Sequence, residues 1–101
     1  MPAETNHLFD SKFSISPDVM FQEISGETVL LDLVSESYFG LDQTATRIWQ
    51  LLRDANTPSR IHQIMAAEFE VDPAQLKTDL VGHLQELLDA GLIAIVDNGE
   101  N

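Results

Sequence analysis

The side chains in this sequence that are best suited to catalysis or metal binding are three histidines and seventeen aspartate and glutamate residues. His7, His62 and His83 fall in different segments, and none has a carboxylate or a second histidine at a spacing typical of a metal site. Pairs such as His83 and Glu86 are expected to be surface neighbours. No two carboxylates stand out as a general acid and base. We therefore expect neither a metal site nor a catalytic site, and no cofactor.

Sequence motifs of nucleophiles and nucleotide-binding loops are also missing. The chain has no cysteine, which excludes disulfides, thiolate nucleophiles and cysteine-ligated metals. It contains no Gly-x-Ser-x-Gly nucleophile elbow and no glycine-rich phosphate loop, since its five glycines are spread as turn and cap residues. The chain is therefore not expected to be an enzyme, and binding is left as its function.

The net charge of -12 restricts the partners that the chain can bind. Nucleic acids and anionic lipid surfaces attract proteins through clustered lysine and arginine side chains. This chain has five scattered cations: Lys12, Arg47, Arg53, Arg60 and Lys77. Nucleic acid and membrane are therefore not expected as partners, whereas a basic or neutral partner remains open, as does a role of the charge in solubility alone.

Length and composition indicate one soluble domain. The chain has 101 residues, of which 44% are hydrophobic and 22% charged, and a domain of this size buries roughly 60 to 68% of its unfolded surface. The first residues lack the basic and apolar regions of a signal peptide, and no apolar run approaches the roughly 18 residues of a membrane span, so a cytoplasmic location is expected. We predict a disordered tail over residues 1–14, a domain over 15–96 and a frayed end over 97–101.

Short apolar segments separated by turn residues predict a three-stranded meander. Residues 19–24 (VMFQEI) and 28–34 (TVLLDLV) flank the turn Ser25-Gly26-Glu27 and favour a hairpin. After a second turn, residues 38–41 (YFGL) read as a third, short strand. This third strand is expected to be an edge of the sheet.

Three helices should follow, each opened by an N-cap residue: Asp42, Thr57 and Asp72. A proline follows the second and the third cap at the first helical position, and Gln75 stands where a capping box needs it. One apolar stripe marks the first helix at Ala45, Ile48, Trp49 and Leu52. The third helix should end at Gly91, and residues 92–96 predict a final strand or a packed extension.

The third helix carries more apolar positions than a core contact needs. Val81, Leu84 and Leu88 form a margin of its apolar band around a single cation, Lys77. One interpretation is a well-buried helix. The other is that this margin lines a groove, in which Lys77 meets a carboxylate.

The order of elements predicts an α+β fold like a winged helix-turn-helix, with a three-stranded antiparallel N-terminal sheet followed by three helices. Such folds often bind DNA, but the helix that would enter the groove, residues 72–90, offers Lys77 as its one cation. A transcription-related role and dimerisation through the edge strand remain alternatives. The favoured use is β-augmentation, in which a peptide adds to an edge strand. Residues 37–41 fit, because Gly40 permits close approach and Tyr38 and Phe39 supply apolar walls.

The sequence resembles the PqqD-like family, whose members are also called RiPP recognition elements. Two runs carry the resemblance: LLDLVSESYFGLDQTATRIWQLL at residues 30–52, and TPSRIHQIMAAEFEVDPAQLKTDLVGHLQELLDAGLI at residues 57–93. The family pattern of Tyr-Phe/Tyr-x-Leu-Asn, Ala-x-x-Ile-Trp and Leu-x-x-Leu-x-x-x-Gly-Leu falls on Tyr38, Phe39, Leu41, Asp42, Ala45, Ile48, Trp49, Leu84, Leu87, Gly91 and Leu92. Asp42 replaces the usual asparagine, and the N-terminal tail is longer than in minimal members.

The resemblance implies a non-catalytic peptide chaperone. Members bind the leader of a ribosomally made precursor peptide as an added strand, on the third strand and against the third helix. They present the precursor to a tailoring enzyme, such as a radical SAM enzyme or a leader peptidase. The expected leader-binding residues are Ser37, Tyr38, Phe39, Gly40, Lys77, Val81, Leu84 and Leu88. Because the chain is acidic, basic leader residues are a further hypothesis.

Overall fold

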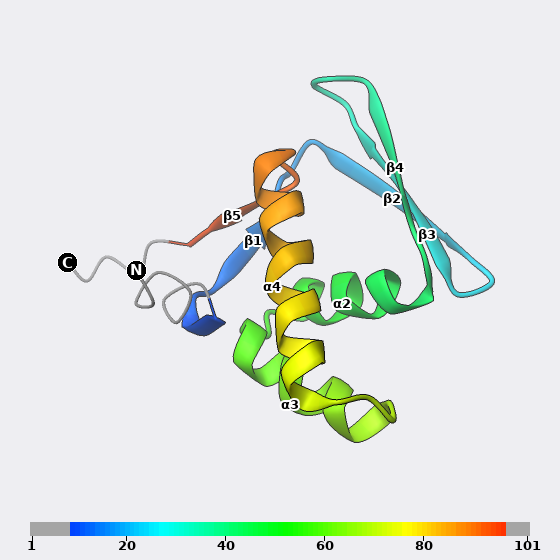
Figure 1. Ribbon diagram of the computed structural model, residues 1–101. Coiled ribbons are helices and arrows are strands. Elements are labelled where there is room, and N and C mark those ends of the chain that lie inside the picture. Colours follow the sequence, from blue (N-terminus) through cyan, green and yellow to red (C-terminus); the bar gives the residue numbers. More distant parts are fainter. Residues whose placement is uncertain (1–8, 97–101) are drawn as a thin grey trace.

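The computed structural model describes residues 9–96, which form a three-stranded sheet, three helices and a separate two-stranded ribbon (Figure 1). The sheet contains β2 (Val19–Ile24), β3 (Glu27–Asp32) and β4 (Ser37–Leu41) in the order β2-β3-β4, and both pairs are antiparallel. The helices are α2 (Gln43–Arg53), α3 (Pro58–Glu68) and α4 (Pro73–Asp89). The predicted α+β order, with a three-stranded sheet before three helices, is confirmed.

The hairpin of β2 and β3 is closed by a two-residue turn. Ser25 and Gly26 both have positive φ, 54° and 84°, as a type I′ turn requires, and this turn matches the twist of the strands that it joins. Ile24 lies opposite Glu27 at the base of the turn. The turn thereby fixes the register of β2 against β3, and β4 pairs on the other side of β3 with Leu30 opposite Phe39.

The predicted N-caps are all present. The side chains of Asp42, Thr57 and Asp72 accept hydrogen bonds from backbone N–H groups three residues later, at 2.9, 3.2 and 3.1 Å. The capping box expected at α4 does not form, because the side-chain amide of Gln75 donates to Asp79 in the next turn instead. At the other end, α4 stops at Gly91, whose φ is 76° and whose N–H donates to the Leu88 carbonyl oxygen.

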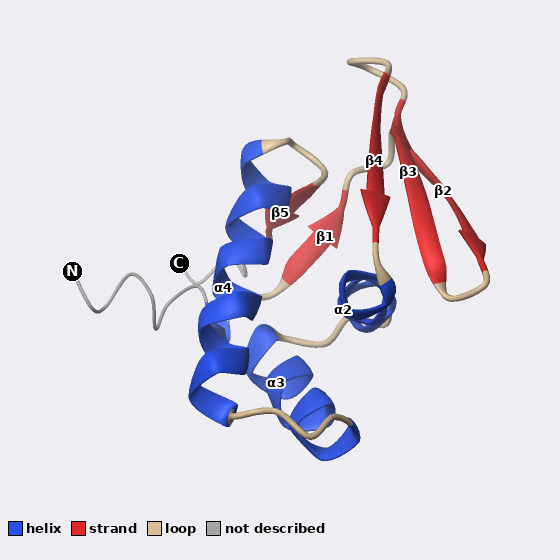
Figure 2. Cartoon of the chain, turned by 45° about the vertical axis from the view of Figure 1, so that its right-hand side comes forward, coloured by secondary structure: helices blue, strands red, loops and turns tan. Residues whose placement is uncertain are grey.

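The core lies where α2 meets the sheet and the other two helices. Helix α2 contacts β1, β3, β4 and α3, while α4 packs on α3 and β5. Trp49 of α2 and Leu30 of β3 are fully buried, together with Ile61, Met65, Leu80, Leu84 and Leu92. Burying each side chain of this size contributes roughly 1.5–3 kcal/mol. As Figure 2 shows, the helices lie to one side of the three-stranded sheet.

The folded part begins earlier than the sequence predicted. Strand β1 (Phe13–Ile15) pairs antiparallel with β5 (Ile93–Ile95), and the Phe13 side chain is buried in the core. Residues 9–14, which the sequence assigned to a disordered tail, therefore belong to the fold. Of the two alternatives for residues 92–96, a final strand or a packed extension, the structure shows the strand, and its partner β1 was not predicted. The remainder of the two predicted tails, residues 1–8 and 97–101, lies outside the described residues.

Candidate functional site

Strand β4 is an edge of the sheet, because β3 is its one strand partner within residues 9–96. The final strand does not cover that edge, since β5 pairs with β1. In antiparallel pairs, opposite residues alternate between hydrogen-bonded and non-hydrogen-bonded. The type I′ turn makes Ile24 and Glu27 a hydrogen-bonded pair, and the 2.9 Å bond from the Leu33 N–H to the Asp18 carbonyl fits the same phase.

This alternation decides which backbone groups of β4 are free. It turns the N–H and C=O of Leu30 away from β2 and toward Phe39 of β4. The N–H and C=O groups of Tyr38 and Gly40 therefore point out of the sheet. The sequence predicted backbone contacts along Ser37 through Gly40, and within this range Tyr38 and Gly40 are the residues whose backbone groups point outward.

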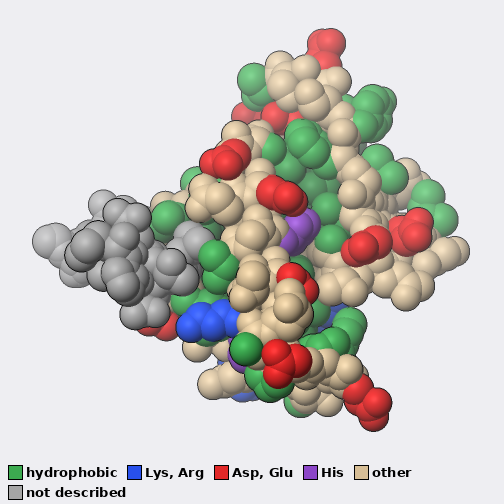
Figure 3. Space-filling model, in the orientation of Figure 1, with side chains coloured by type: hydrophobic (Ala, Val, Ile, Leu, Met, Phe, Trp, Pro, Cys, Tyr) green, Lys and Arg blue, Asp and Glu red, His purple; other side chains and the backbone are tan. Residues whose placement is uncertain are grey.

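A cleft of about 430 Å³ lies between this edge and α4. Its strand side is formed by Tyr38, Phe39, Gly40 and Leu41, and its other side by His83, Glu86, Leu87, Ala90 and Leu92. Leu41, Leu87 and Leu92 are buried and give the cleft an apolar floor. Figure 3 shows a hollow between helix and sheet, with acidic side chains along its rim. The arrangement offers free backbone groups and apolar surface side by side.

His83 is the titratable side chain set most deeply in the cleft wall. Its Nε2 is buried and has no hydrogen-bond partner among residues 9–96, and its Nδ1 lies 3.8 Å from the carboxylate of Glu86. Burial lowers the pKa of His83 below its ordinary value, while the negative charges of Glu86 and Asp42 oppose this effect. The buried position therefore favours the neutral imidazole.

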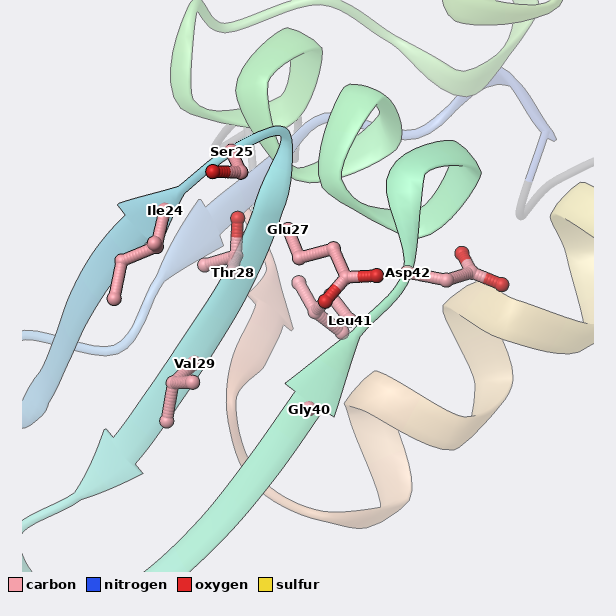
Figure 4. Close-up of a pocket in the computed structure, with 8 residues that line it drawn as sticks. All are labelled: Ile24, Ser25, Glu27, Thr28, Val29, Gly40, Leu41 and Asp42. Carbon is pink, nitrogen blue, oxygen red and sulfur yellow. The ribbon is translucent and has the colours of Figure 1, made fainter.

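A second hollow, of about 530 Å³, lies on the opposite side of Gly40, against the turn of the β2–β3 hairpin. Figure 4 shows the carboxylates of Glu27 and Asp42 near the end of β4. Gly40 lines both hollows. A methyl group added at Gly40 would meet no atom within 4 Å among the described residues. The end of β4 is therefore open on both sides and surrounded by negative charge.

Three of the eight predicted site residues line the cleft. Tyr38, Phe39 and Gly40 line the cleft, and Ser37 lies half-exposed at the start of β4. The four residues predicted on the helix do not line it: Lys77, Val81, Leu84 and Leu88. Leu84 is fully buried in the core, and Val81 and Leu88 are half-buried against it. The Lys77 ammonium lies 4.8 Å from the centre of the Phe9 ring.

The helix thus faces the cleft with the flank opposite to the predicted one, and sequence reasoning missed His83, Glu86, Leu87 and Ala90. The apolar margin around Lys77 makes contacts within the chain, because Val81 and Leu88 pack on the core and Lys77 lies over the Phe9 ring. The signal that could have identified the other flank is its composition. A histidine, a glutamate and a small alanine at spacings of three and four suit a helix surface that borders water and still leaves room for a ligand.

The cations of the helices are engaged within the chain. Arg47 makes a two-pronged ion pair with Glu68, at 3.0 and 2.6 Å, and this pair raises the pKa of Arg47 and lowers that of Glu68. Arg53 pairs with Glu23 on the sheet. Because these groups are spread over several elements, the described residues form no basic patch of the kind that binds nucleic acid.

Residues 9–96 contain neither a metal site nor a membrane-spanning helix. No three side chains of histidine, aspartate or glutamate are grouped so that they could hold a metal ion. No helix in this part of the chain has the length and hydropathy needed to cross a bilayer.

Comparisons with known proteins give consistent matches. The sequence model of a family described as Coenzyme PQQ synthesis protein D (PqqD) matches residues 27–93. A solved structure of TbiB1 in complex with the TbiA(beta) leader peptide is 35% identical, with a TM-score of 0.76 over 87% of this chain and 98% of that one. A lasso peptide synthetase B1 complexed with the leader peptide is 28% identical, with a TM-score of 0.75 over 81% of this chain and 96% of that one. No curated protein matches.

Proposed function

This chain belongs to the PqqD family, and we propose that it is a non-catalytic recognition element that binds the leader of a ribosomally made precursor peptide. The leader adds to β4 as a new strand and lies in the cleft against α4. The observation that carries this proposal is the open edge of β4 beside an apolar floor. Its support from relatives is that two similar structures are complexes with leader peptides.

The backbone and the side chains of the leader contribute differently to the binding free energy. The N–H and C=O groups of Tyr38 and Gly40 can bond a peptide strand without regard to its sequence, at about 0.5–1.5 kcal/mol each. Folding of a disordered leader on binding costs about 2–5 kcal/mol. Backbone bonds alone therefore give little net affinity. Apolar leader side chains on the floor of Leu41, Leu87 and Leu92 must supply most of the roughly 8 to 12 kcal/mol that micromolar to nanomolar binding needs.

We further propose that the leader carries a basic residue near the end of β4. Glu27, Asp42 and Glu86 surround that end. A lysine or arginine in the added strand would meet these carboxylates at a partly exposed site, where an ion pair contributes up to about 1 kcal/mol. Replacing the basic residues of the leader by glutamine should weaken binding several-fold, and the difference should shrink as the salt concentration rises. An unchanged affinity at low salt would reject this assignment.

The bound precursor is then presented to a modifying enzyme, such as a radical SAM enzyme or a leader peptidase. The role of this chain is to raise the local concentration of the precursor at that enzyme. The enzyme should accordingly process its precursor faster when this chain is present, and the gain should vanish with a precursor that lacks its leader. An equal gain without the leader would contradict presentation.

Two substitutions at one position test strand addition. Gly40→Pro removes the outward N–H of Gly40 and is compatible with an edge strand. Gly40→Ala keeps this N–H, and its added methyl group meets no atom of the described residues within 4 Å. The probe is a labelled leader of the precursor encoded next to the gene of this chain, titrated by fluorescence anisotropy. We expect Gly40→Pro to weaken binding at least about 30-fold and Gly40→Ala less than about threefold. Equal binding by both variants would reject strand addition.

Position 39 provides a second comparison. The N–H of Phe39 faces β3, so Phe39→Pro should disturb the sheet itself and lower the free energy of unfolding. Gly40→Pro should leave the urea midpoint close to that of the parent. A large loss of stability in Gly40→Pro would show that the alternation along β4 has been assigned in the wrong phase.

A further inference from the structure

The face of the three-stranded sheet that points away from α2 is apolar and exposed. We call it the outer face. Its apolar side chains are Met20, Ile24, Val29, Leu31 and Tyr38, and its polar ones are Gln22 and Glu27. The exposed fractions of Met20, Ile24 and Tyr38 are 57%, 59% and 73%. The helices lie on the other side of the sheet (Figure 2), so no helix in the described part of the chain covers this face.

The composition of the outer face is unusual for a surface that meets water. An antiparallel sheet with one solvated face normally alternates apolar residues inside with polar residues outside. In β3 the inner positions are Thr28, Leu30 and Asp32, yet two of the three outward positions are the apolar residues Val29 and Leu31. Exposed apolar patches of this kind mark interaction surfaces.

The outer face is continuous with the edge that we assign to the leader. Tyr38 lines the cleft beside α4 and also a hollow on the outer face that includes Met20 and Leu31. Gly40 likewise lines the cleft and the hollow next to Ile24 and Val29. A protein seated on the outer face would therefore border the added strand along its whole length on β4.

The charged residues around the outer face are acidic, and they favour a basic partner protein over a second copy of this chain. Glu27 lies at one end of the face and Glu36 in the turn at the other. The arginines at positions 47, 53 and 60 and Lys77 belong to the helices, and Lys12 precedes β1. A second copy of this chain would bring together two surfaces with acidic rims on molecules of net charge -12 each, which disfavours self-association.

We propose that the outer face docks the enzyme that processes the bound precursor, through an apolar surface of that enzyme rimmed by lysine or arginine. The proposal rests on the function proposed above. It places the enzyme directly beside the leader strand, with Tyr38 shared between both contacts. Leader and enzyme would then bind on adjacent faces of the same edge strand and would not compete.

The test uses a triple variant, Met20→Thr, Ile24→Thr and Val29→Thr. Threonine keeps the β-propensity of these positions and removes their apolar surface. Val71→Thr is the matched control, because Val71 lies in the turn between α3 and α4 and has the same exposed fraction as Val29, 45%. The probe is the purified modifying enzyme encoded next to the gene of this chain, titrated by biolayer interferometry with and without the leader.

We expect the triple variant to bind the enzyme at least about tenfold more weakly and the labelled leader within about twofold of the parent, while Val71→Thr changes neither. Ala90→Tyr, which fills the cleft from α4 and lies away from the outer face, should lose the leader and keep the enzyme, so failure of the proposed function and failure of this inference give different results. Equal enzyme binding by parent and triple variant would overturn the docking face. So would a parent dimer in light scattering that the triple variant converts to monomer, since the occupant would then be a second copy.

Discussion

The two flanks of α4 differ: one is apolar and covered by the core, and the other is more polar and lines the cleft. On one flank the Lys77 ammonium contacts the Phe9 ring, and Val81 and Leu88 pack on the core. The flank with His83 and Glu86 borders the cleft and β4. The sequence suggested the flank with Lys77, Val81 and Leu88 as the binding surface because it is more apolar. In the structure this flank instead makes contacts within the chain. A flank that stays in water until a peptide arrives needs polar side chains above an apolar floor.

The largest expected effect comes from filling the cleft. Ala90 is half-exposed on the cleft wall, and Ala90→Tyr would place a ring where leader side chains must pack. We expect the affinity for the labelled leader to fall at least about 50-fold, with the urea midpoint nearly unchanged. Ala90→Ser is the matched control and should bind within about twofold of the parent. Unchanged binding by the tyrosine variant would place the leader elsewhere on the molecule.

A smaller effect is expected from pH, through His83. Because its pKa in the folded protein lies below the ordinary value, the neutral form is favoured, and the stability that this gives is complete above pH 6.5 and lost as the pH falls through the folded pKa. A leader that covers the cleft desolvates His83 further, so affinity should drop as the pH falls below the folded pKa, which itself lies below 6.5, by at most about tenfold per pH unit.

The pH effect can be assigned to this side chain by substitution. His83→Gln has no titrating group at that position, although Glu86 and Asp42 still face it. Isothermal titration with a leader that lacks histidine should therefore give a flatter affinity profile between pH 5 and 7 for this variant than for the parent. Identical profiles would show that His83 stays outside the contact.

The smallest effect on binding is expected on the other flank. Lys77→Ala removes the contact of the ammonium with the Phe9 ring, which is worth about 0.5–1 kcal/mol at an exposed site. The free energy of unfolding should fall by about this amount in a urea titration, and leader affinity should stay within about twofold. A large loss of affinity would restore the assignment that the sequence suggested, in which Lys77 meets a carboxylate of the leader.

The sequence was most informative where a local interaction decides the structure. Asp42, Thr57 and Asp72 opened three helices, and Ser25-Gly26 closed a hairpin, because caps and turns act over three or four residues. The three-residue strand β1 has no such signal. Its pairing with β5 joins segments almost a chain length apart, and this long-range contact is what places Phe13 in the core.

The candidate site likewise has one part that local sequence signals predict, the edge strand, and one part that depends on long-range packing, the flank of α4. The edge strand was predictable from its short length and its aromatic residues. The Ser25-Gly26 turn sets which backbone groups of β3 face β4, but the register of β4 on β3 comes from the structure. The choice between the flanks of α4 depends on what packs beside Lys77, and Phe9 lies in a segment that lacks a hydrophobic period. The periodicity of residues 73–89 showed how wide the apolar band of α4 is. It could not show which side of this band would be covered by the segment that contains Phe9.

The central claim is that the N–H groups of Tyr38 and Gly40 form bonds with an added strand. Amide hydrogen exchange, measured residue by residue with NMR in the free and leader-saturated protein, tests it directly. In the free protein, Phe39 should be protected by β3 while its two neighbours exchange fast. Saturation with leader should slow exchange at Tyr38 and Gly40 at least about tenfold, whereas unchanged exchange at both amides would contradict strand addition to β4.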